Sequence, residues 1–295
     1  GYTYSFYYSD SGGGWTTWRT ESRELGLVST TLQAADGFNP KYPAWVEKTP
    51  KYTILKGGFC AAAVGSKIYL MGGNTSSTKV TKVDIYDASN DSWSAGTPML
   101  TARNAHSCVA AGSYIYITGG RNSDNETLTS IHRLNTVFGS WSYFYPSMSS
   151  AREQHISLNE GTPLFTFGGL GASSVEWVTH DGNNSNSGVG MPIQMNHMGG
   201  VGFGSSPNWK GYLIGRIKYD SWANSCNNAA YYKTCYSYNP YDNDSPNWSA
   251  CASMPTARSN VAAVVLDSKI YAIGGRNCAG DTNKVEVYTP ASNTW

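Results

Sequence analysis

An apolar run that ends in two glycines, Ile115-Tyr116-Ile117-Thr118-Gly119-Gly120, recurs along this 295-residue chain. Residues 68–73, 164–169 and 270–275 have the same form, and residues 211–216 keep the first glycine but have Arg216 in place of the second. The first glycines stand at positions 72, 119, 168, 215 and 274, so the steps between them are 47, 49, 47 and 59 residues. Self-similarity at a period of this length indicates a repeat architecture.

Two further landmarks keep the same phase. A tryptophan follows a tyrosine or leucine by seven residues at four places: Tyr86 and Trp93, Leu134 and Trp141, Tyr241 and Trp248, and Tyr288 and Trp295. The segment Met-x-x-Ala-Arg occupies residues 99–103, 148–152 and 254–258, and residues 191–195 fill the same slot without the arginine. Three markers that hold one phase over more than 200 residues define a repeating unit.

We predict four short antiparallel strands in each unit. The glycine doublet ends the second strand, because glycine adopts positive φ and lets neighbouring chains approach closely. The tyrosine near the end of the third strand and the tryptophan at the start of the fourth are expected to pack across their hairpin. One such sheet cannot bury both of its faces, whereas copies arranged radially can, so the repeat predicts a β-propeller.

The glycine doublet, the spaced tyrosine and tryptophan, and the Met-x-x-Ala-Arg segment together resemble kelch repeats over residues 54–295. The resemblance implies an all-β propeller with four-stranded antiparallel blades. Dividing the chain by the repeat length predicts one domain of six blades, at about 1–53, 54–101, 102–150, 151–193, 194–256 and 257–295. We expect residues 2–8 to pair with the last blade and close the ring. Alternatively, they form the first strand of the first blade, and the last blade is short.

Composition excludes several classes of protein. Aromatic residues make up 13% of the chain and charged residues only 14%, which is unlike a disordered protein. The formal net charge is +1, so there is no general attraction to nucleic acid, and we predict no nucleic-acid partner. The chain has no apolar run long enough to span a membrane as a helix, and we predict no membrane span.

Cysteine and asparagine usage favours a secreted protein. The chain has six cysteines, begins at Gly1 without a leader, and is expected to be a processed product. Six Asn-x-Ser/Thr triplets are predicted glycosylation sites: Asn74, Asn90, Asn125, Asn183, Asn243 and Asn247. We predict disulfides between Cys235 and Cys251, across one hairpin, and between Cys226 and Cys278, in corresponding loops of adjacent blades. Cys60 and Cys108 lie in neighbouring first strands and are either buried thiols or a third bridge.

Arginines gather at one end of the predicted blades, where first strands begin and second strands end; we name this end the loop face. Arg103, Arg152 and Arg258 precede first strands, and Arg121, Arg216 and Arg276 follow second strands. Loops on a rigid scaffold carry recognition, and arginine grips carboxylates or sulfates, so all six are candidate ligand-binding residues. The alternative for the three arginines of Met-x-x-Ala-Arg is a structural role, in which they bind carbonyl groups between blades.

Catalytic and metal sites find little support in the sequence. His106, His155 and His197 lie near the starts of first strands and could surround a metal at the axis, but a packing role suits them better. We identify no nucleophile motif and no phosphate-binding glycine loop, so we predict no catalytic residue, no metal and no cofactor.

The function that fits these observations is a secreted, non-enzymatic binding protein. It would recognise a protein or glycan ligand, with an anionic one suited to the arginines, through the strand 2–3 and strand 4–1 loops of the loop face. In cytoplasmic kelch propellers this face binds acidic peptides, so the resemblance implies peptide or protein recognition. Two other classes stay open: a propeller enzyme, either a copper-radical oxidase or a glycosidase, and a structural or matrix protein built from repeats.

Overall fold

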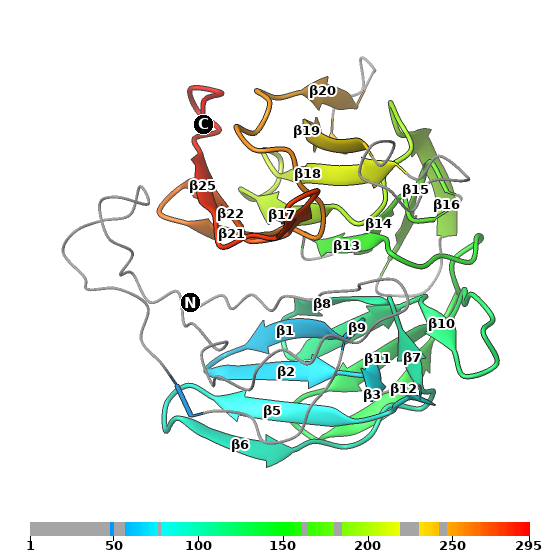
Figure 1. The fold of residues 1–295 in the computed structure, drawn as a ribbon. Coiled ribbons are helices and arrows are strands. Elements are labelled where there is room, and N and C mark those ends of the chain that lie inside the picture. The colour runs from blue at the N-terminus through cyan, green and yellow to red at the C-terminus, as the bar shows by residue number, and fades with distance from the viewer. Residues whose placement is uncertain are drawn as a thin grey trace.

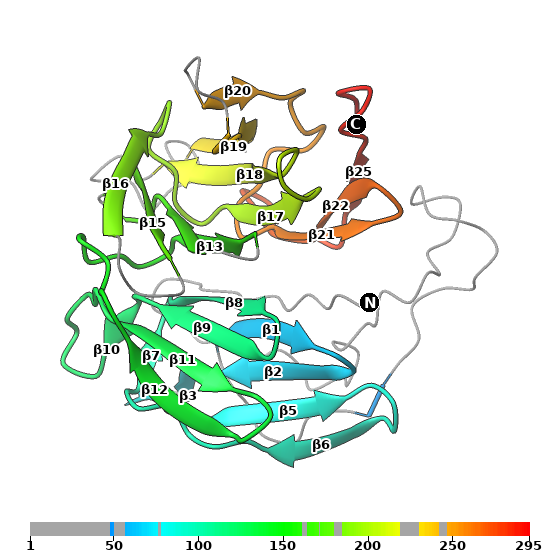
Figure 2. The ribbon, with the colours of Figure 1, turned by 180° about the vertical axis from the view of Figure 1, so that it is seen from behind.

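The computed structural model describes residues 48–49, 57–75, 78–160, 164–170, 172–179, 185–218, 230–241 and 247–295. Their strands form five sheets around a central axis, which is the arrangement of a β-propeller (Figure 1). The innermost strands contact one another in chain order around this axis, and the outermost strands lie at the periphery in both face-on views (Figure 2). No helix among the described residues has the length and apolar character needed to cross a membrane.

The blades follow the repeat units in order, and we name them A to E. Blade A has β1 (Cys60–Val64), β2 (Lys67–Met71), β5 (Val83–Asp87) and β6 (Ser92–Ala95). Blade B has β8 (Ser107–Ala111), β9 (Tyr114–Thr118), β11 (Ile131–Asn135) and β12 (Ser140–Phe144). Blade C has β13 (Ile156–Asn159), β14 (Leu164–Phe167), β15 (Ser174–Val178) and β16 (Ser185–Gly190). Blade D has β17 (Gly199–Phe203), β18 (Lys210–Lys218), β19 (Ala230–Tyr238) and β20 (Trp248–Ala250), and blade E has β21 (Ala262–Leu266), β22 (Lys269–Ile273) and β25 (Val285–Tyr288).

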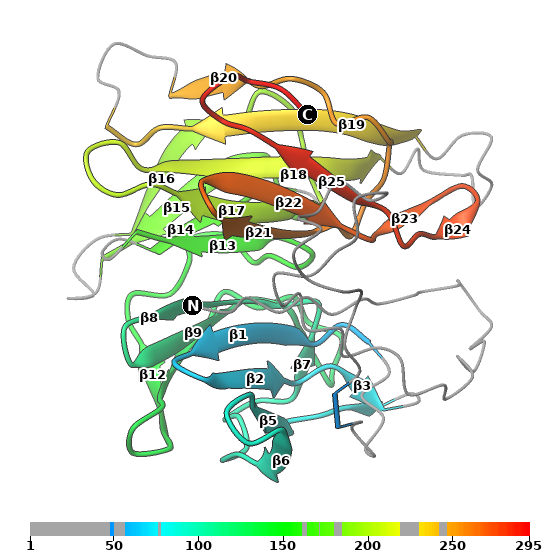
Figure 3. The same cartoon turned by 90° about the vertical axis from the view of Figure 1, so that its left-hand side faces the viewer.

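All pairings within the blades are antiparallel, and short extra ladders extend three of the blades at the loop face. These ladders are β3 (Asn74–Thr75) with β4 (Thr78–Lys79), β7 (Arg103–Asn104) with β10 (Arg121–Asn122), and β23 (Arg276–Asn277) with β24 (Gly280–Asp281). In the side view β3, β7, β23 and β24 lie at the same end of the molecule (Figure 3). These ladders thus lie at the loop face, where first strands begin and second strands end.

The glycine doublet has the steric role that the sequence predicted. Gly72 and Gly73 adopt φ of 68° and 88°, in the region that favours glycine. A Cβ at Gly72 would lie 2.7 Å from the carbonyl oxygen of Arg103 in the next blade. The N–H of Gly73 instead donates to that carbonyl at 2.8 Å. The doublet is thus where the second strand of one blade approaches the backbone of the next.

The aromatic landmark packs as predicted in blades A and E. The ring centroids of Tyr86 and Trp93 are 5.1 Å apart, and those of Tyr288 and Trp295 are 5.2 Å apart. In blade D the prediction was wrong, because Trp248 packs on Tyr238, at 5.0 Å, and Tyr241 lies in the exposed turn. The longer turn of this hairpin separates the two rings by ten residues of sequence instead of seven.

The tryptophan side chains also connect neighbouring blades. The indole N–H of Trp141 donates to the carbonyl of Thr97 at 2.9 Å, and that of Trp295 donates to the carbonyl of Ala252 at 2.6 Å. Each acceptor lies just after the fourth strand of the preceding blade. Trp93 of blade A makes the same bond, at 2.8 Å, to the carbonyl of Thr49.

The bond to Thr49 bears on the number of blades. Thr49 stands before blade A as Thr97 stands before blade B, which is the relation that a preceding blade over residues 1–53 requires. That sixth blade and the pairing of residues 2–8 lie outside the described residues. Six blades therefore remain a prediction, with five of them described.

Two disulfides lie within the described residues. Cys235 pairs with Cys251 as predicted, and Cys60 pairs with Cys108, which joins the inner strands of blades A and B. For Cys60 and Cys108 the sequence allows either a bridge or two buried thiols, and the structure has the bridge. Cys226 lies outside the described residues, and Cys278 is exposed, so the predicted pairing of these two residues is untested.

Candidate functional site

A chain of backbone hydrogen bonds runs from blade to blade at the centre of the loop face. Its residues immediately precede the inner strands, and all have positive φ: Gly58, Ala105, Gln154, His197 and Asn260. Each of the last four donates its N–H to the carbonyl of the one before it, at distances of 2.8, 2.8, 3.2 and 2.7 Å in that order. We name these five residues the collar. Positive φ is unfavourable for the four that are not glycine, so the hydrogen bonds between blades impose this backbone conformation.

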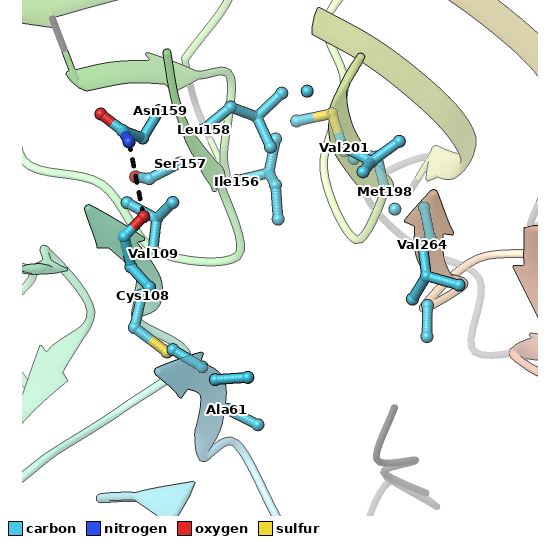
Figure 4. A pocket seen from close by; sticks show the side chains of 18 of the residues that line it. Ala61, Cys108, Val109, Ile156, Ser157, Leu158, Asn159, Met198, Val201 and Val264 are labelled. Carbon is cyan, nitrogen blue, oxygen red and sulfur yellow. Dashed lines mark hydrogen bonds between the residues drawn. The ribbon is translucent and has the colours of Figure 1, made fainter. Parts of the chain in front are cut away.

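A cavity of about 380 Å³ lies next to the collar, between the inner strands (Figure 4). Small and apolar residues of all five inner strands make most of its wall, including the run of three alanines that begins at Ala61. Asn159 is a polar exception, and its side-chain N–H donates to the carbonyl of Ala110 at 3.4 Å. Polar and apolar atoms therefore both contribute to the wall of this cavity.

The arginines of Met-x-x-Ala-Arg are fully buried. Arg103, Arg152 and Arg258 each have 0% of their surface exposed. They donate to backbone carbonyls of their own blades, those of Gly119, Gly168 and Ala272, at 2.8, 2.8 and 2.9 Å respectively. The predicted role in direct ligand contact does not suit side chains in this position. We assign them a structural role, which differs from the predicted alternative because the carbonyl groups belong to the same blade and not to a neighbouring one.

The other three arginines do lie at the surface of the loop face. Arg121 is 39% exposed and pairs with Glu153 of blade C at 2.5 Å. Arg276 is 26% exposed and pairs with Asp281 at 3.4 Å. Both arginines follow the second glycine of a doublet and therefore have the same place in their repeats.

Arg216 has a different place in its repeat from Arg121 and Arg276. It stands at the position of the second glycine, where the pairing of β18 with β19 shifts register between Ile214 and Arg216. Its guanidinium lies 3.7 Å from the ring centroid of Tyr232 and donates to the carbonyl of Gln194 at 3.2 Å. Ring stacking thus holds Arg216 at this end of blade D in an orientation of its own.

The histidines are packing residues in the described structure. His106 and His155 are buried, with Nε2 at 3.1 Å from the carbonyl of Met71 and 2.8 Å from the hydroxyl of Thr118, respectively. Burial, followed by nearby arginine charge, lowers the pKa of each to about 3. His197 is not at the same repeat position, because it belongs to the collar and Met198 takes the place of the buried histidine. The described residues contain no cluster of His, Cys, Asp and Glu suited to a metal.

The predicted glycosylation sites differ in exposure. Asn90 and Asn125 are exposed, and Asn74 and Asn247 are half-buried. The side-chain amide of Asn247 donates to the carbonyl of Asn239 at 3.0 Å, inside a hairpin turn. Asn183 and Asn243 lie outside the described residues. Of the sites in view, Asn90 and Asn125 best suit a glycan.

Family comparisons match kelch repeats in two parts of the chain. The Kelch-repeats domain described for KLHDC2, KLHL20 and DRC7 matches residues 45–181, and the Kelch motif matches residues 257–295. Kelch-like protein 25 of Xenopus tropicalis is 24% identical over 251 residues, which cover 80% of this chain and 40% of that protein. A putative F-box/kelch-repeat protein of Arabidopsis thaliana is 46% identical over 50 residues, covering 16% of this chain and 13% of that protein.

Among solved structures, that of YjhT superposes with a TM-score of 0.67 at 14% identity, over 83% of this chain and 87% of that one. At this identity the likeness is evidence of the fold alone, and it agrees with the propeller described above. The chain spans about 40% of the length of the kelch-like relatives that it matches over most of its own length.

Proposed function

Because this chain is a kelch-repeat β-propeller, we propose that it is a binding module for a protein partner and that its loop face recognises an acidic segment of that partner. The observation that carries the proposal is the placement of Arg121 and Arg276 at the same repeat position, with both guanidinium groups partly exposed. Arg216 adds a third cation at this end, held by the ring of Tyr232.

The ion pairs of these arginines suit exchange with a ligand. Exposed pairs contribute roughly 0–1 kcal/mol each, so a carboxylate of a partner can replace Asp281 or share Arg276 with it at small cost. Arg121 is anchored through Nη2 to the largely buried Glu153, and its side chain is still 39% exposed to a ligand. A planar guanidinium held in this way binds a carboxylate with two parallel hydrogen bonds.

A direct test replaces the three loop-face arginines by alanine and measures binding to fluorescent peptides rich in Asp and Glu by anisotropy. The matched control replaces Lys67, Lys210 and Lys269, which begin second strands at the opposite end of the propeller, so it removes the same charge from the other face. We expect the arginine variant to lose affinity by at least about tenfold per interacting arginine, and the lysine variant to bind nearly as the unchanged protein does.

The salt dependence of binding provides a second readout. Affinity for the acidic peptides should fall as salt rises, because exposed charges are screened over about 8–10 Å at physiological ionic strength. Equal affinities for the arginine and lysine variants would place the ligand elsewhere and refute the proposal. Peptides with Gln and Asn in place of Glu and Asp should bind weakly to all three proteins.

A glycan is a second candidate ligand, favoured by a separate observation at the edge of blade B. Tyr143 and Tyr145 are 54% and 68% exposed, and their rings lie 6.3 Å apart at 30° to each other. Exposed aromatic faces of this kind suit sugar rings. The test compares the unchanged protein with the double variant Tyr143→Ala, Tyr145→Ala on a glycan array. Binding by the unchanged protein alone would support a glycan ligand, and equal signals from the two proteins would exclude this site.

We further propose that the protein is extracellular. The disulfides between Cys60 and Cys108 and between Cys235 and Cys251 support an oxidising compartment. The exposed triplets at Asn90 and Asn125 support glycosylation there. Native material should lose mass on enzymatic removal of N-glycans, and Asn90→Gln and Asn125→Gln should each remove one glycan. An unchanged mass would count against secretion through a glycosylating pathway.

A further inference from the structure

The buried arginines have one set of partners that repeats from blade to blade. In blade C, Arg152 donates from Nη2 and Nε to the carboxylate of Glu176, at 2.5 and 3.2 Å. The same carboxylate accepts the backbone N–H groups of Ser149 and Ser150, at 2.6 and 3.1 Å. Four donors from the strand 4–1 loop thus converge on one carboxylate from β15.

Blade E builds the same site from equivalent residues. Arg258 pairs with Glu286 of β25, with Nη2 and Oε2 3.2 Å apart. The hydroxyl and backbone N–H of Thr256 donate to the two oxygens of that carboxylate, at 2.6 and 3.4 Å. Glu176 and Glu286 hold corresponding places in their third strands, opposite Thr166 and Ala272 of the second strands.

Blade B keeps the donors and lacks the acid. Arg103 corresponds to Arg152, and Leu100 and Thr101 correspond to Ser149 and Ser150. The residue at the acid's position is His132, opposite Ile117. Both nitrogens of its ring lie 3.2–3.3 Å from Nη2 of Arg103, so the histidine meets only one corner of the guanidinium.

Several donors in blade B have no acceptor among the described residues. Nε of Arg103 is buried and has no hydrogen-bond partner among the described residues. The described residues also place no acceptor on the backbone N–H groups of Leu100 and Thr101. A buried cation without a countercharge is costly, and the buried, unsatisfied Nε of Arg103 costs about 1–3 kcal/mol more.

Blade D shows that the two partners change together elsewhere in the ring. There Met195 takes the place of the arginine, and Tyr236 takes the place of the acid. Both groups are uncharged, so at these two positions blade D has neither a cation nor a need for an anion. Among the described blades, B alone has the buried arginine and the loop donors without a carboxylate.

The loop donors of blade B lie close to solvent. Leu100 is 43% exposed, Thr101 is half-buried, and Tyr143, whose ring packs edge-on against His132, is 54% exposed. Burial, and then the charge of Arg103, lowers the pKa of His132 to about 4, so the ring is neutral at pH 7 and supplies no charge of its own. The exposed Leu100 and Tyr143 therefore mark where this part of blade B meets solvent.

We propose that blade B has a carboxylate-binding site in which a carboxylate from outside the chain accepts hydrogen bonds from Leu100, Thr101 and Arg103, as Glu176 does in blade C. The ligand class is a carboxylate, either a small free acid or the Asp or Glu side chain of a bound protein. The site uses none of Arg121, Arg216 and Arg276 as a donor, although Arg121 lies on the strand that pairs with Arg103 and Asn104.

The test measures thermal unfolding of the whole chain in sodium acetate, with acetamide plus sodium chloride at equal ionic strength as the uncharged control. The unchanged protein should gain about 2–4 °C in Tm at an acetate concentration ten times its dissociation constant, in a saturable manner. His132→Ala enlarges the site and should respond more strongly. His132→Glu supplies the carboxylate within the chain, and it should begin with a higher Tm and show no response to acetate.

The outcomes distinguish this site from the loop-face arginines Arg121, Arg216 and Arg276, and they distinguish the two sources of the carboxylate. Equal acetate responses in all three proteins, or no response in His132→Ala, would overturn the proposal. The variant that lacks the three loop-face arginines should keep the acetate response, whatever becomes of its peptide binding. A response to acidic peptides that exceeds that to acetate, and that His132→Glu abolishes, would identify a protein side chain as the ligand.

Discussion

Replacing Glu176 by glutamine tests the structural role of the buried arginines. The carboxylate of Glu176 is 1% exposed and accepts four hydrogen bonds, two from Arg152 and two from backbone N–H groups. Burial raises the pKa of Glu176, but hydrogen bonds from Arg152 and its charge outweigh burial and keep the pKa below its ordinary value. The glutamine keeps one acceptor oxygen, but its NH₂ group would face the N–H of Ser149 or the guanidinium.

The loss expected for Glu176→Gln follows from leaving Arg152 charged and buried. Removing one partner of a buried ion pair costs about 3–5 kcal/mol. For a domain of this size each kcal/mol corresponds to about 2 °C, so Tm should fall by roughly 6–10 °C. Differential scanning calorimetry at pH 7, together with urea unfolding, measures both quantities.

A double-mutant cycle keeps the test specific to the pair. Arg152→Met copies the uncharged residue that blade D has at this position, and the double variant Arg152→Met, Glu176→Gln should be less destabilised than the sum of the single variants. A change in stability of less than about 1 kcal/mol for Glu176→Gln, or strict additivity in the cycle, would refute the structural role.

Three further predictions concern the repeat and its supports. Gly72→Ala should destabilise the protein by about 2 kcal/mol more than Gly65→Ala in urea unfolding. Both glycines have positive φ, but only a Cβ at Gly72 would meet backbone, at 2.7 Å from a carbonyl oxygen. Equal losses of stability in the two variants would contradict this reasoning. The buried His106 has a pKa of about 3, against 6.5 in an unfolded chain. Its contribution to stability should therefore be complete above pH 6.5 and decline by about 1.4 kcal/mol per pH unit as the pH falls toward 3. His106→Gln should make stability depend less on pH over this range, as measured by urea unfolding at several pH values. The disulfide of Cys235 and Cys251 closes a loop with a sequence separation of 16, so Cys235→Ser with Cys251→Ser should cost about 3 kcal/mol under oxidising conditions and match the unchanged protein after reduction of this bond.

The repeat landmarks predicted the fold well because each has a packing cause. The glycine of each doublet marks close approach to the next blade, as at Gly72, and Trp93 and Trp295 mark the hairpins of third and fourth strands. Trp248 shows the limit of this approach. Tyr241 precedes it by the expected seven residues, but the ring that packs on Trp248 is Tyr238, ten residues before it. The spacing alone does not reveal which of several nearby tyrosines faces the tryptophan.

The candidate site was less predictable, because charge does not reveal the direction of a side chain. Arg152 has the same side chain as Arg121, yet the first is fully buried and the second is 39% exposed. A usable signal lay in the third strands, where Glu176 and Glu286 occupy equivalent places and supply a countercharge inside the protein. The register of His197 could also have been counted, since it lies two residues after the arginine slot and not three.

We propose that the loop face is the binding face of this propeller. Hydrogen–deuterium exchange of the protein with and without its tightest acidic peptide tests this claim most directly. We predict protection of the segments around Arg121 and Arg276, at residues 119–128 and 274–283, with little change at the turns near Gly65, Gly112 and Ser268. Protection confined to those turns, with exchange at the loop segments unaltered, would contradict the claim.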